Sequence, residues 1–146
     1  MPQLTFPVLS RELTLPVFIG ITRRATLVAL AAGGPILAPV ATTGMIDTGT
    51  SITCVAGQVI RQLGLTRVAR ASTQTVAGQV AVDLFEVSLT LGIAGGQAGP
   101  VLVQPDLVVM ELSNPPPGVD VLIGMDILLD SRFLLDGPGR QFFLDW

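Results

Sequence analysis

The sequence predicts an all-β domain: a closed or partly open barrel of short strands with one or two short helices. Hydrophobic residues make up 49% of the chain and charged residues 13%, and Val, Leu, Ile and Thr abound, as in a well-buried, strand-rich fold. Short apolar and alternating runs are separated by turns rich in Gly and Pro. No helical period suits a coiled coil, and no repeat suits a solenoid. The 146 residues are predicted to form one domain, 1–146, with a sizeable core.

The N-terminal third is expected to be extended. Pro7 and Pro16 favour edge positions in their strands, because proline has no backbone N–H to donate. Gly33-Gly34-Pro35 is predicted to be a turn, so the apolar stretch 27–40 is interpreted as a hairpin or a pair of strands. Arg23-Arg24 is interpreted as a solvated turn. Strands are predicted over residues 4–10, 13–21, 26–30 and 36–46.

The middle of the chain predicts one helix and one long hairpin. A helix is expected over residues 56–63, with Gly64 at its C-terminal end. Residues 68–75 and 80–91 are predicted to be strands joined by Val76-Ala77-Gly78-Gln79, and the alternation of apolar and polar residues is cleanest over 87–91. Residues 92–99 are predicted to be a glycine-rich loop.

The C-terminal third predicts further strands and a hairpin. Asn114-Pro115-Pro116-Pro117-Gly118 is a stiff linker, and Asp126 is expected to be the N-cap of a short helix over 127–130. Gly137-Pro138-Gly139 separates two apolar runs and predicts a hairpin turn. Strands are predicted over residues 100–111, 121–123, 133–136 and 141–144.

The composition excludes several function classes. The chain contains no histidine, which removes Ser-His and Cys-His nucleophilic pairs and histidine metal ligands. The net charge is −3 and no basic stripe is present, so nucleic-acid binding is not expected. Cys54 is the only cysteine and is interpreted as a small buried hydrophobe at the start of a helix. The acidic residues show no metal-ligand pattern, and no cofactor is predicted.

No membrane segment is predicted within the chain. The N-terminus has no basic region of the kind that begins a signal peptide. The stretch 27–40 is too short and too interrupted by Gly and Pro for a spanning helix. We therefore expect a soluble domain, while an anchor outside this sequence and the cellular location stay open.

One stretch carries recognisable chemistry: Met45-Ile46-Asp47-Thr48-Gly49-Thr50-Ser51. A carboxylate follows an apolar strand, where burial is costly unless the group is paired or hydrogen-bonded. Gly49 permits a tight turn, and the hydroxyl residues supply donors beside the carboxylate. Taken alone, the stretch is equally compatible with an ordinary Asx turn. A second stretch, Asp120 to Leu128, is an apolar strand that ends in Gly124.

Together the two stretches resemble the retropepsin-like aspartic peptidases, over roughly residues 10–146. That family carries Asp-Thr-Gly after one strand and a later apolar pair followed by Gly. The Gly124-Met125-Asp126 form is more similar to the cellular, bacterial and retrotransposon branches than to the viral one. The resemblance implies a retropepsin-like barrel with a flap, a hairpin that closes over the substrate. It places the flap at the predicted turn over 76–79.

The resemblance also implies site residues. Asp47, Thr48 and Gly49 would be the catalytic motif, with Thr48 bonding across a twofold axis and Gly49 offering backbone groups to the substrate. Ile123-Gly124 matches the element that supports the active-site loop. The implied substrate-binding residues are Thr50, Ser51, Val76, Ala77, Gly78, Ile123 and Gly124. The predicted walls of the cleft are Ile52, Val76, Val80 and Ile123. Because these side chains are apolar, the cleft would favour apolar substrate side chains on both sides of the scissile bond.

The single Asp-Thr-Gly implies two chains. Peptide hydrolysis by this chemistry uses two carboxyl groups that share one proton around a water. Asp136-Gly137 is not a second copy of the motif, and Asp126 follows its glycine, so the second carboxylate is expected from Asp47 of another molecule. The predicted function is therefore that of a homodimeric aspartic endopeptidase acting on a peptide or protein substrate. The terminal segments 4–6 and 142–146 either pair in the dimer interface or close each barrel.

Two details depart from the viral pattern. Viral relatives often carry an Asp–Arg pair at the places of Ser51 and Met125, which are both neutral here. Thr50 stands where many viral relatives have Ala. Its hydroxyl is expected either to donate to the Asp47 carboxylate, which would favour an acidic optimum, or to pack into the core.

Two other classes of function remain. A catalytically silent dimerisation or peptide-binding domain could keep the fold and the motif, because fold resemblance does not establish activity. A carrier barrel for an apolar ligand would not need Asp47 at all. The sequence leaves the natural substrate and the cleavage specificity undefined.

Overall fold

The computed structural model of the chain describes residues 2–92 and 99–146, and its architecture is all-β with three short helices in that part of the chain. Most of the predicted loop 92–99 lies outside the described residues. The helices are α1 (Arg23–Ala31), α2 (Gly57–Gln62) and α3 (Met125–Leu128). The strands are β1 (Gln3–Pro7), β2 (Thr14–Gly20), β3 (Val40–Ile46), β4 (Cys54–Ala56), β5 (Ala69–Thr75), β6 (Gly78–Leu91), β7 (Leu102–Leu112), β8 (Val121–Ile123), β9 (Arg132–Asp136) and β10 (Gln141–Asp145).

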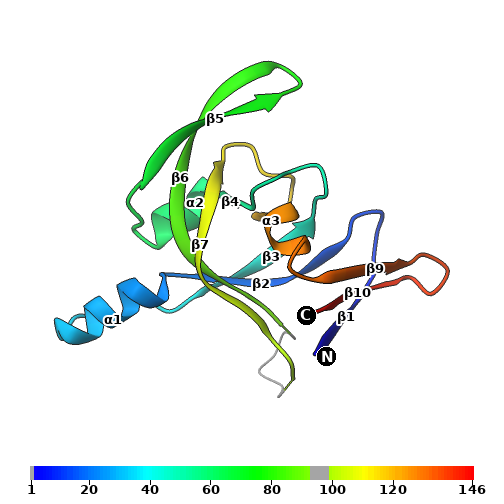
Figure 1. The fold of residues 1–146 in the computed structure, drawn as a ribbon, viewed down its shortest axis with the longest axis horizontal. Coiled ribbons are helices and arrows are strands. Elements are labelled where there is room, and N and C mark those ends of the chain that lie inside the picture. The colour runs from blue at the N-terminus through cyan, green and yellow to red at the C-terminus, as the bar shows by residue number, and fades with distance from the viewer. Residues whose placement is uncertain (1, 93–98) are drawn as a thin grey trace.

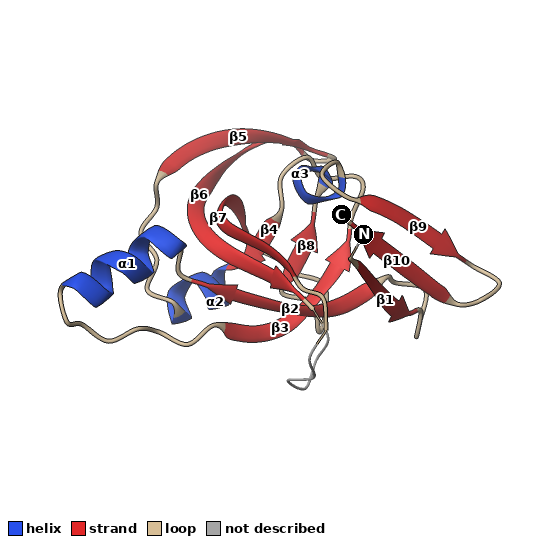
Figure 2. Ribbon diagram, turned by 60° about the horizontal axis from the view of Figure 1, so that its bottom comes forward, coloured by secondary structure: helices blue, strands red, loops and turns tan. Residues whose placement is uncertain are grey.

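The strands form two sheets, and the larger one closes into a ring. Its order is β2-β3-β8-β4-β7-β6-β5, and a further pairing of β2 with β6 joins the two sides (Figure 2). The strand β5 lies outside the ring, hydrogen-bonded to β6 alone. The core inside the ring is apolar, because alternate residues of β2 and β6, such as Val17, Ile19, Val87 and Leu89, are fully buried.

The smaller sheet has the order β1-β10-β9. The two ends of the described chain pair with each other in it, with Leu4 opposite Leu144 and Phe6 opposite Phe142. The rings of Phe6 and Phe142 lie 5.2 Å apart, and Phe142 is completely buried. Within this chain the two terminal segments pair with each other in the small sheet, and their pairing in a dimer interface stays a prediction.

Two parallel pairings position the candidate site. Strand β3 runs parallel to β8, with Gly44 opposite Val121 and Ile46 opposite Ile123. Parallel strands end at the same edge of a sheet, so the residues that follow β3 and β8 are brought together. On the other side of β3, Gly44 allows close packing against β2, because a Cβ at this position would collide with the side chain of Val17.

The prediction of a strand over residues 26–30, and of a hairpin or strand pair over 27–40, is wrong. Residues 23–31 form α1, which projects away from the ring (Figure 1). The Oγ1 of Thr22 accepts the Ala25 N–H at 3.0 Å, which is an N-cap. The alanines of this stretch favour a helix, and this preference prevails over the β-branched Thr26 and Val28. Arg23 and Arg24 therefore begin a helix, and β3 begins only at Val40.

The proline predictions have different outcomes. Pro7 lies in β1, an edge strand, as predicted. Pro16 lies in β2, which pairs with both β3 and β6, so the edge prediction is wrong for that strand. The pairing with β6 begins only at Val17, so the missing N–H of Pro16 interrupts no ladder on that side.

The other predicted elements are confirmed with small shifts. Gly64 follows α2 with a φ of 62°, the left-handed conformation that commonly ends helices. The hairpin of β5 and β6 and the hairpin of β9 and β10 lie where the sequence predicts them. Cys54 is buried as expected, but it begins β4 instead of a helix. In the described part of the chain, no helix combines the length and apolar character needed to cross a membrane.

Candidate active site

Asp47 occupies a tight turn directly after β3. Its backbone N–H donates to the Ile123 carbonyl at 2.9 Å, which continues the pairing of β3 and β8. Its carboxylate Oδ1 accepts the Gly49 N–H at 2.9 Å, and its carbonyl accepts the Thr50 N–H at 3.3 Å. The Asx-turn interpretation is therefore geometrically correct, and it coexists with a half-buried carboxylate beside exposed Thr48 and Gly49.

The segment that follows β8 supports the Asp47 turn through backbone hydrogen bonds and close packing. The Met125 N–H donates to the Thr50 carbonyl at 2.9 Å, and the Asp126 N–H donates to the Ser51 carbonyl at 3.1 Å. Gly124 is buried against the same loop, where an added Cβ would lie 2.9 to 3.0 Å from backbone atoms of residues 50, 52 and 53. Only glycine fits such a close backbone approach, which explains the Gly in the second sequence motif.

A side-chain clamp adds to these backbone contacts. Thr53 is fully buried, its N–H donates to Asp126 Oδ2 at 2.9 Å, and its hydroxyl donates to Asp126 Oδ1 at 2.7 Å. The same hydroxyl accepts the Gly124 N–H at 3.1 Å. The backbone N–H and the hydroxyl of the buried Thr53 therefore both have hydrogen-bond partners, as buried polar groups usually do.

The prediction that Asp126 caps a helix is wrong. The N-cap of α3 is Gly124, and Asp126 lies in the first turn, where its carboxylate faces Thr53 instead. Sequence reasoning also missed Thr53 as a residue of the site. The only sequence signal was a hydroxyl within the apolar run that follows Asp47, together with a carboxylate directly after the second motif.

Thr50 does not donate to the Asp47 carboxylate. Its hydroxyl donates to the Ile52 carbonyl at 2.9 Å and lies 3.8 Å from the Cys54 sulfur. The expected tuning of Asp47 by this hydroxyl is therefore wrong, and with it the sequence-based ground for an acidic optimum. Burial raises the pKa of the Cys54 thiol, with smaller contributions from the charges of Asp47 and Asp126, while the hydrogen bond with Thr50 opposes the rise.

A cleft of about 640 Å³ lies beside this turn. The loop supplies one wall, including Asp47, Thr50 and Ser51. The hairpin of β5 and β6 supplies the opposite wall through residues 71–75 and the side chains of Val80, Val82 and Leu84. The remaining lining residues are mostly apolar: Gly49, Ile52, Cys54, Met110, Glu111, Leu112, Ser113, Asn114 and Leu122.

The other predicted site residues lie outside the cleft wall. Val76 and Ala77 form the exposed turn of the hairpin, and Gly78 begins β6 with a φ of 112°. The Thr75 hydroxyl closes this turn, donating to the Gly78 carbonyl and accepting the Ala77 N–H. Ile123 is fully buried beneath the Asp47 turn, so of the four guessed walls only Ile52 and Val80 line the cleft.

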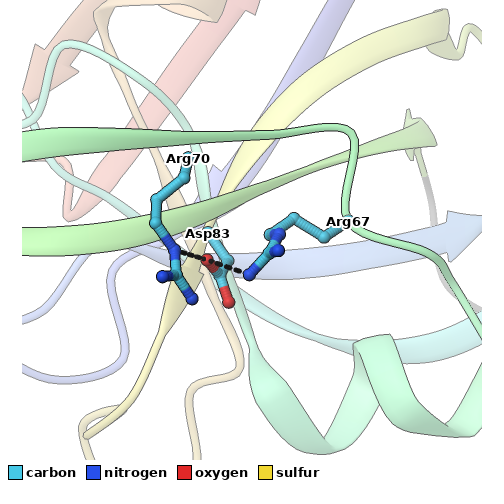
Figure 3. A network of polar contacts seen from close by, with 3 residues as sticks. All are labelled: Arg67, Arg70 and Asp83. Carbon is cyan, nitrogen blue, oxygen red and sulfur yellow. Dashed lines mark hydrogen bonds and ion pairs between the residues drawn. The ribbon is translucent and has the colours of Figure 1, made fainter.

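Hydrogen bonds between charged side chains link the two strands of the β5–β6 hairpin at the end away from its turn. Asp83 in β6 accepts hydrogen bonds from Arg70 at 2.9 Å and from Arg67 at 3.3 Å (Figure 3). The hydrogen bond from Arg70 is the main cause that lowers the pKa of the Asp83 carboxyl. Because the pKa of Asp83 is lowered in the folded chain, its contacts with the two arginines stabilise the fold at pH values above the usual carboxyl pKa. This stabilisation is lost as the pH falls through the lowered pKa. The cluster is exposed, so its effect is small.

No group of three or more acidic or thiol side chains suited to a metal ion occurs among residues 2–92 and 99–146. Asp47 lines the cleft on a braced turn opposite the hairpin of β5 and β6, and Cys54 and Glu111 are the other titratable residues of the lining. This arrangement can present a carboxylate to a bound chain or to a water in the cleft.

Comparisons with known proteins agree with this geometry. A family model described as aspartyl protease matches residues 28–127. The fold is similar to the crystal structure of a retropepsin-like aspartic protease from Rickettsia conorii, with a TM-score of 0.58, 14% identity, and coverage of 97% of this chain and 89% of that chain. No curated protein matches the chain by sequence.

Weaker structural matches are also found. The retroviral protease-like domain of Ddi1 from Leishmania major matches with a TM-score of 0.46 and 15% identity, covering 91% of this chain and 89% of that chain. The EIAV protease complexed with the inhibitor HBY-793 matches with a TM-score of 0.45 and 18% identity, covering 84% of this chain and 89% of that chain.

Proposed function

Because the chain belongs to the aspartyl protease family and has the retropepsin-like fold, we propose that it is an aspartic endopeptidase that works as a homodimer. Two Asp47 carboxyl groups, one from each chain, activate the water that attacks the peptide bond. The observation that carries this proposal is the place of Asp47 on a braced turn at the wall of a cleft of about 640 Å³.

The second carboxylate is assigned to another chain because the described acidic residues near the motif are otherwise engaged. Asp126 is bound to Thr53, and Asp120 accepts hydrogen bonds from Thr42 and Gln58. Glu111 also lines the cleft, but its carboxylate lies against Gly57 of α2, where an added Cβ would collide with it. A twofold axis beside the Asp47 turn supplies an identical carboxyl group without any further motif.

The chemistry follows from two carboxyl groups that share one proton. Like charges in close contact do not both ionise, so one group of the pair is protonated while the other is a carboxylate. The carboxylate takes a proton from the water as it attacks the carbonyl carbon, and the protonated group donates to the carbonyl oxygen. As the C–N bond breaks, the proton taken from the water passes to the leaving amine, and a hydroxyl of the tetrahedral intermediate returns its proton to the other carboxylate, so the pair is back in its starting state.

The remaining site residues take positioning roles in this proposal. Thr48 packs across the twofold axis, and Gly49 offers its backbone to the substrate. The turn of Val76, Ala77 and Gly78 closes over the bound chain as a flap, with the cleft walls of β5 and β6 below it. Ile123 and Gly124 hold the loop from beneath, and Thr50 and Ser51 line the cleft beside Asp47.

The cleft should prefer apolar side chains on both sides of the scissile bond. Its side-chain walls near Asp47 are formed by Ile52, Val80, Val82 and Leu84, and burial of an apolar substrate side chain against them is favourable by about 25 cal/mol per Å². A mixture of peptides digested by the protein and read by mass spectrometry measures this preference. Cleavage sites dominated by charged residues at both flanking positions would contradict the proposed binding mode, and an absence of all cleavage would contradict the proposed activity.

A further inference from the structure

The helix α1 and the segment after it expose a group of large apolar side chains. No residue of α1 is buried, and Leu27, Val28 and Leu30 are exposed by 56%, 63% and 56%. The segment that follows the helix runs back to β3 (Figure 2) and adds the exposed Ile36 and Leu37. Among the residues that the structure describes, no other stretch of this length exposes as many large apolar side chains. These five residues are called the α1 patch below.

The ring of strands does not require α1. Strands β2 and β3 are antiparallel neighbours, with Ile19 opposite Val40, and a tight turn is sufficient to join such strands. The chain instead places residues 21–39 between them. A helix of a globular domain normally buries its apolar side chains against the core, whereas α1 projects away from the ring (Figure 1). The α1 patch is therefore left for a partner outside the chain.

The charge beside the α1 patch is positive. Arg23 and Arg24 are exposed in the first turn of α1, and neither forms a salt bridge within residues 2–92 and 99–146. They are the only charged side chains from residue 13 to residue 46, in a chain whose net charge is −3. Two arginines at this end do not stabilise the helix, because a helix N-terminus already carries partial positive charge. Asp106 of β7 lines a hollow of about 390 Å³ with both arginines and offsets part of their charge.

We propose that α1 and the segment after it bind a membrane surface that contains anionic lipids. The side chains of the α1 patch enter the apolar part of the bilayer interface, and Arg23 and Arg24 bind the lipid phosphates. A helix of 9 residues is too short to cross a bilayer, so α1 lies along the surface. Because β3 connects this segment directly to Asp47, the bound helix holds the cleft close to the lipid surface. The proposal goes beyond the peptidase activity and does not depend on it.

The composition and place of the α1 patch favour a membrane over a protein partner. Its side chains are all Leu, Val or Ile, and residues 21–39 contain no aromatic residue and no methionine, which are the apolar residues that protein interfaces favour. A bilayer accepts aliphatic side chains without a matching shape. Since α1 projects from the ring, it can enter a lipid surface while the strands stay outside it (Figure 1).

The electrostatic part is tested by sedimentation with lipid vesicles. Wild-type protein should bind vesicles of phosphatidylcholine and phosphatidylglycerol, and it should bind vesicles of phosphatidylcholine alone much more weakly. Arg23→Gln combined with Arg24→Gln should weaken binding to the anionic vesicles roughly 20- to 30-fold, since each arginine near such a surface contributes about a factor of five. Arg11→Gln combined with Arg132→Gln removes the same charge elsewhere and should weaken binding far less.

The apolar part is tested by Val28→Glu, which places a carboxylate in the α1 patch. This variant should weaken binding to the anionic vesicles by at least about tenfold, because a charged group replaces an inserted side chain. Val28 is exposed and Glu is a good helix former, so urea denaturation should show an unchanged fold. Val68→Glu is the matched control, because Val68 is a similarly exposed valine outside the patch, and it should bind vesicles nearly as well as the wild type.

A fluorescent label locates the contact independently. Leu27→Cys carrying an environment-sensitive dye should shift its emission to the blue when anionic vesicles are added, whereas the same dye on Val68→Cys should not. The native Cys54 is buried, and labelling of the wild type gives the background. Equal emission shifts at both positions, or no shift at residue 27, would contradict the proposal.

Several binding results would overturn the proposal. These are a wild type that binds neither kind of vesicle, equal binding to both kinds, or binding that survives Val28→Glu and the double arginine variant. A wild type that ignores vesicles but forms assemblies larger than a dimer, which Val28→Glu disperses, would assign the α1 patch to a second copy instead. Asp47→Asn protein should bind vesicles like the wild type, so failure of this proposal and failure of the peptidase proposal are distinct results.

Discussion

Replacing Asp47 by Asn is expected to abolish peptide hydrolysis while the chain stays folded. Asn keeps the Oδ1 that accepts the Gly49 N–H at 2.9 Å, so the turn after β3 is preserved. The change removes the acid and base of the proposed pair, and loss of such a group lowers rates by roughly 10²- to 10⁴-fold. The free energy of unfolding should change by less than about 1 kcal/mol. Assays of kcat/KM and urea denaturation measure the two quantities.

Asp106→Asn is the matched control, because Asp106 is an exposed aspartate in β7 outside the cleft lining. It should retain full activity. Asp47→Asn protein that still hydrolyses peptides after removal of contaminating proteases would contradict the assignment. A wild type that binds peptides in the cleft without cleaving them would favour the silent binding domain instead.

Replacing Gly124 by Ala is expected to have the largest effect on the architecture of the site. The new Cβ would lie 2.9 Å from the Ile52 carbonyl carbon and 3.0 Å from both the Thr50 oxygen and the Thr53 nitrogen. These are backbone atoms that cannot rotate away, so the Asp47 turn must shift. Overpacking of this kind costs about 1–3 kcal/mol. We expect a lower free energy of unfolding together with a large loss of activity.

Gly34→Ala controls for the general effect of adding a methyl group. The nearest atom to its Cβ would be the Ala29 oxygen at an ordinary 3.7 Å, and Gly34 adopts no left-handed φ. Its free energy of unfolding should stay within about 0.5 kcal/mol of wild type. Urea denaturation of both variants makes the comparison, and equal stabilities would show that Gly124 does not hold the loop.

The parts of the site that depend on local sequence were predictable. Asp47 and Gly124 each follow an apolar run, so the two strand ends were predicted, whereas the parallel pairing that brings them to one edge is a distant contact seen only in the structure. The hairpin of β5 and β6 follows from alternation and turn residues. The strand ends and the hairpin require only the pattern of neighbouring residues, so the sequence contains them directly.

The parts that depend on distant contacts were not predictable. Thr53 and Asp126 are 73 residues apart, and no local pattern reveals their pairing. The Thr50 hydroxyl was expected either to donate to the Asp47 carboxylate or to pack into the core, and in the fold it donates to the Ile52 carbonyl. The α1 segment mixes β-branched residues with alanine, so propensity alone supported both a strand and a helix.

The central claim is that each active site needs one Asp47 from each of two chains. It is tested most directly by mixing wild-type protein with Asp47→Asn protein at a fixed total concentration, after confirming that subunits exchange. Dimers form at random in such a mixture, so an equal mixture should retain about one quarter of the wild-type activity, since only dimers of two wild-type chains are active. Retention of about one half, in direct proportion to the wild-type chains present, would show that each chain contains a complete site.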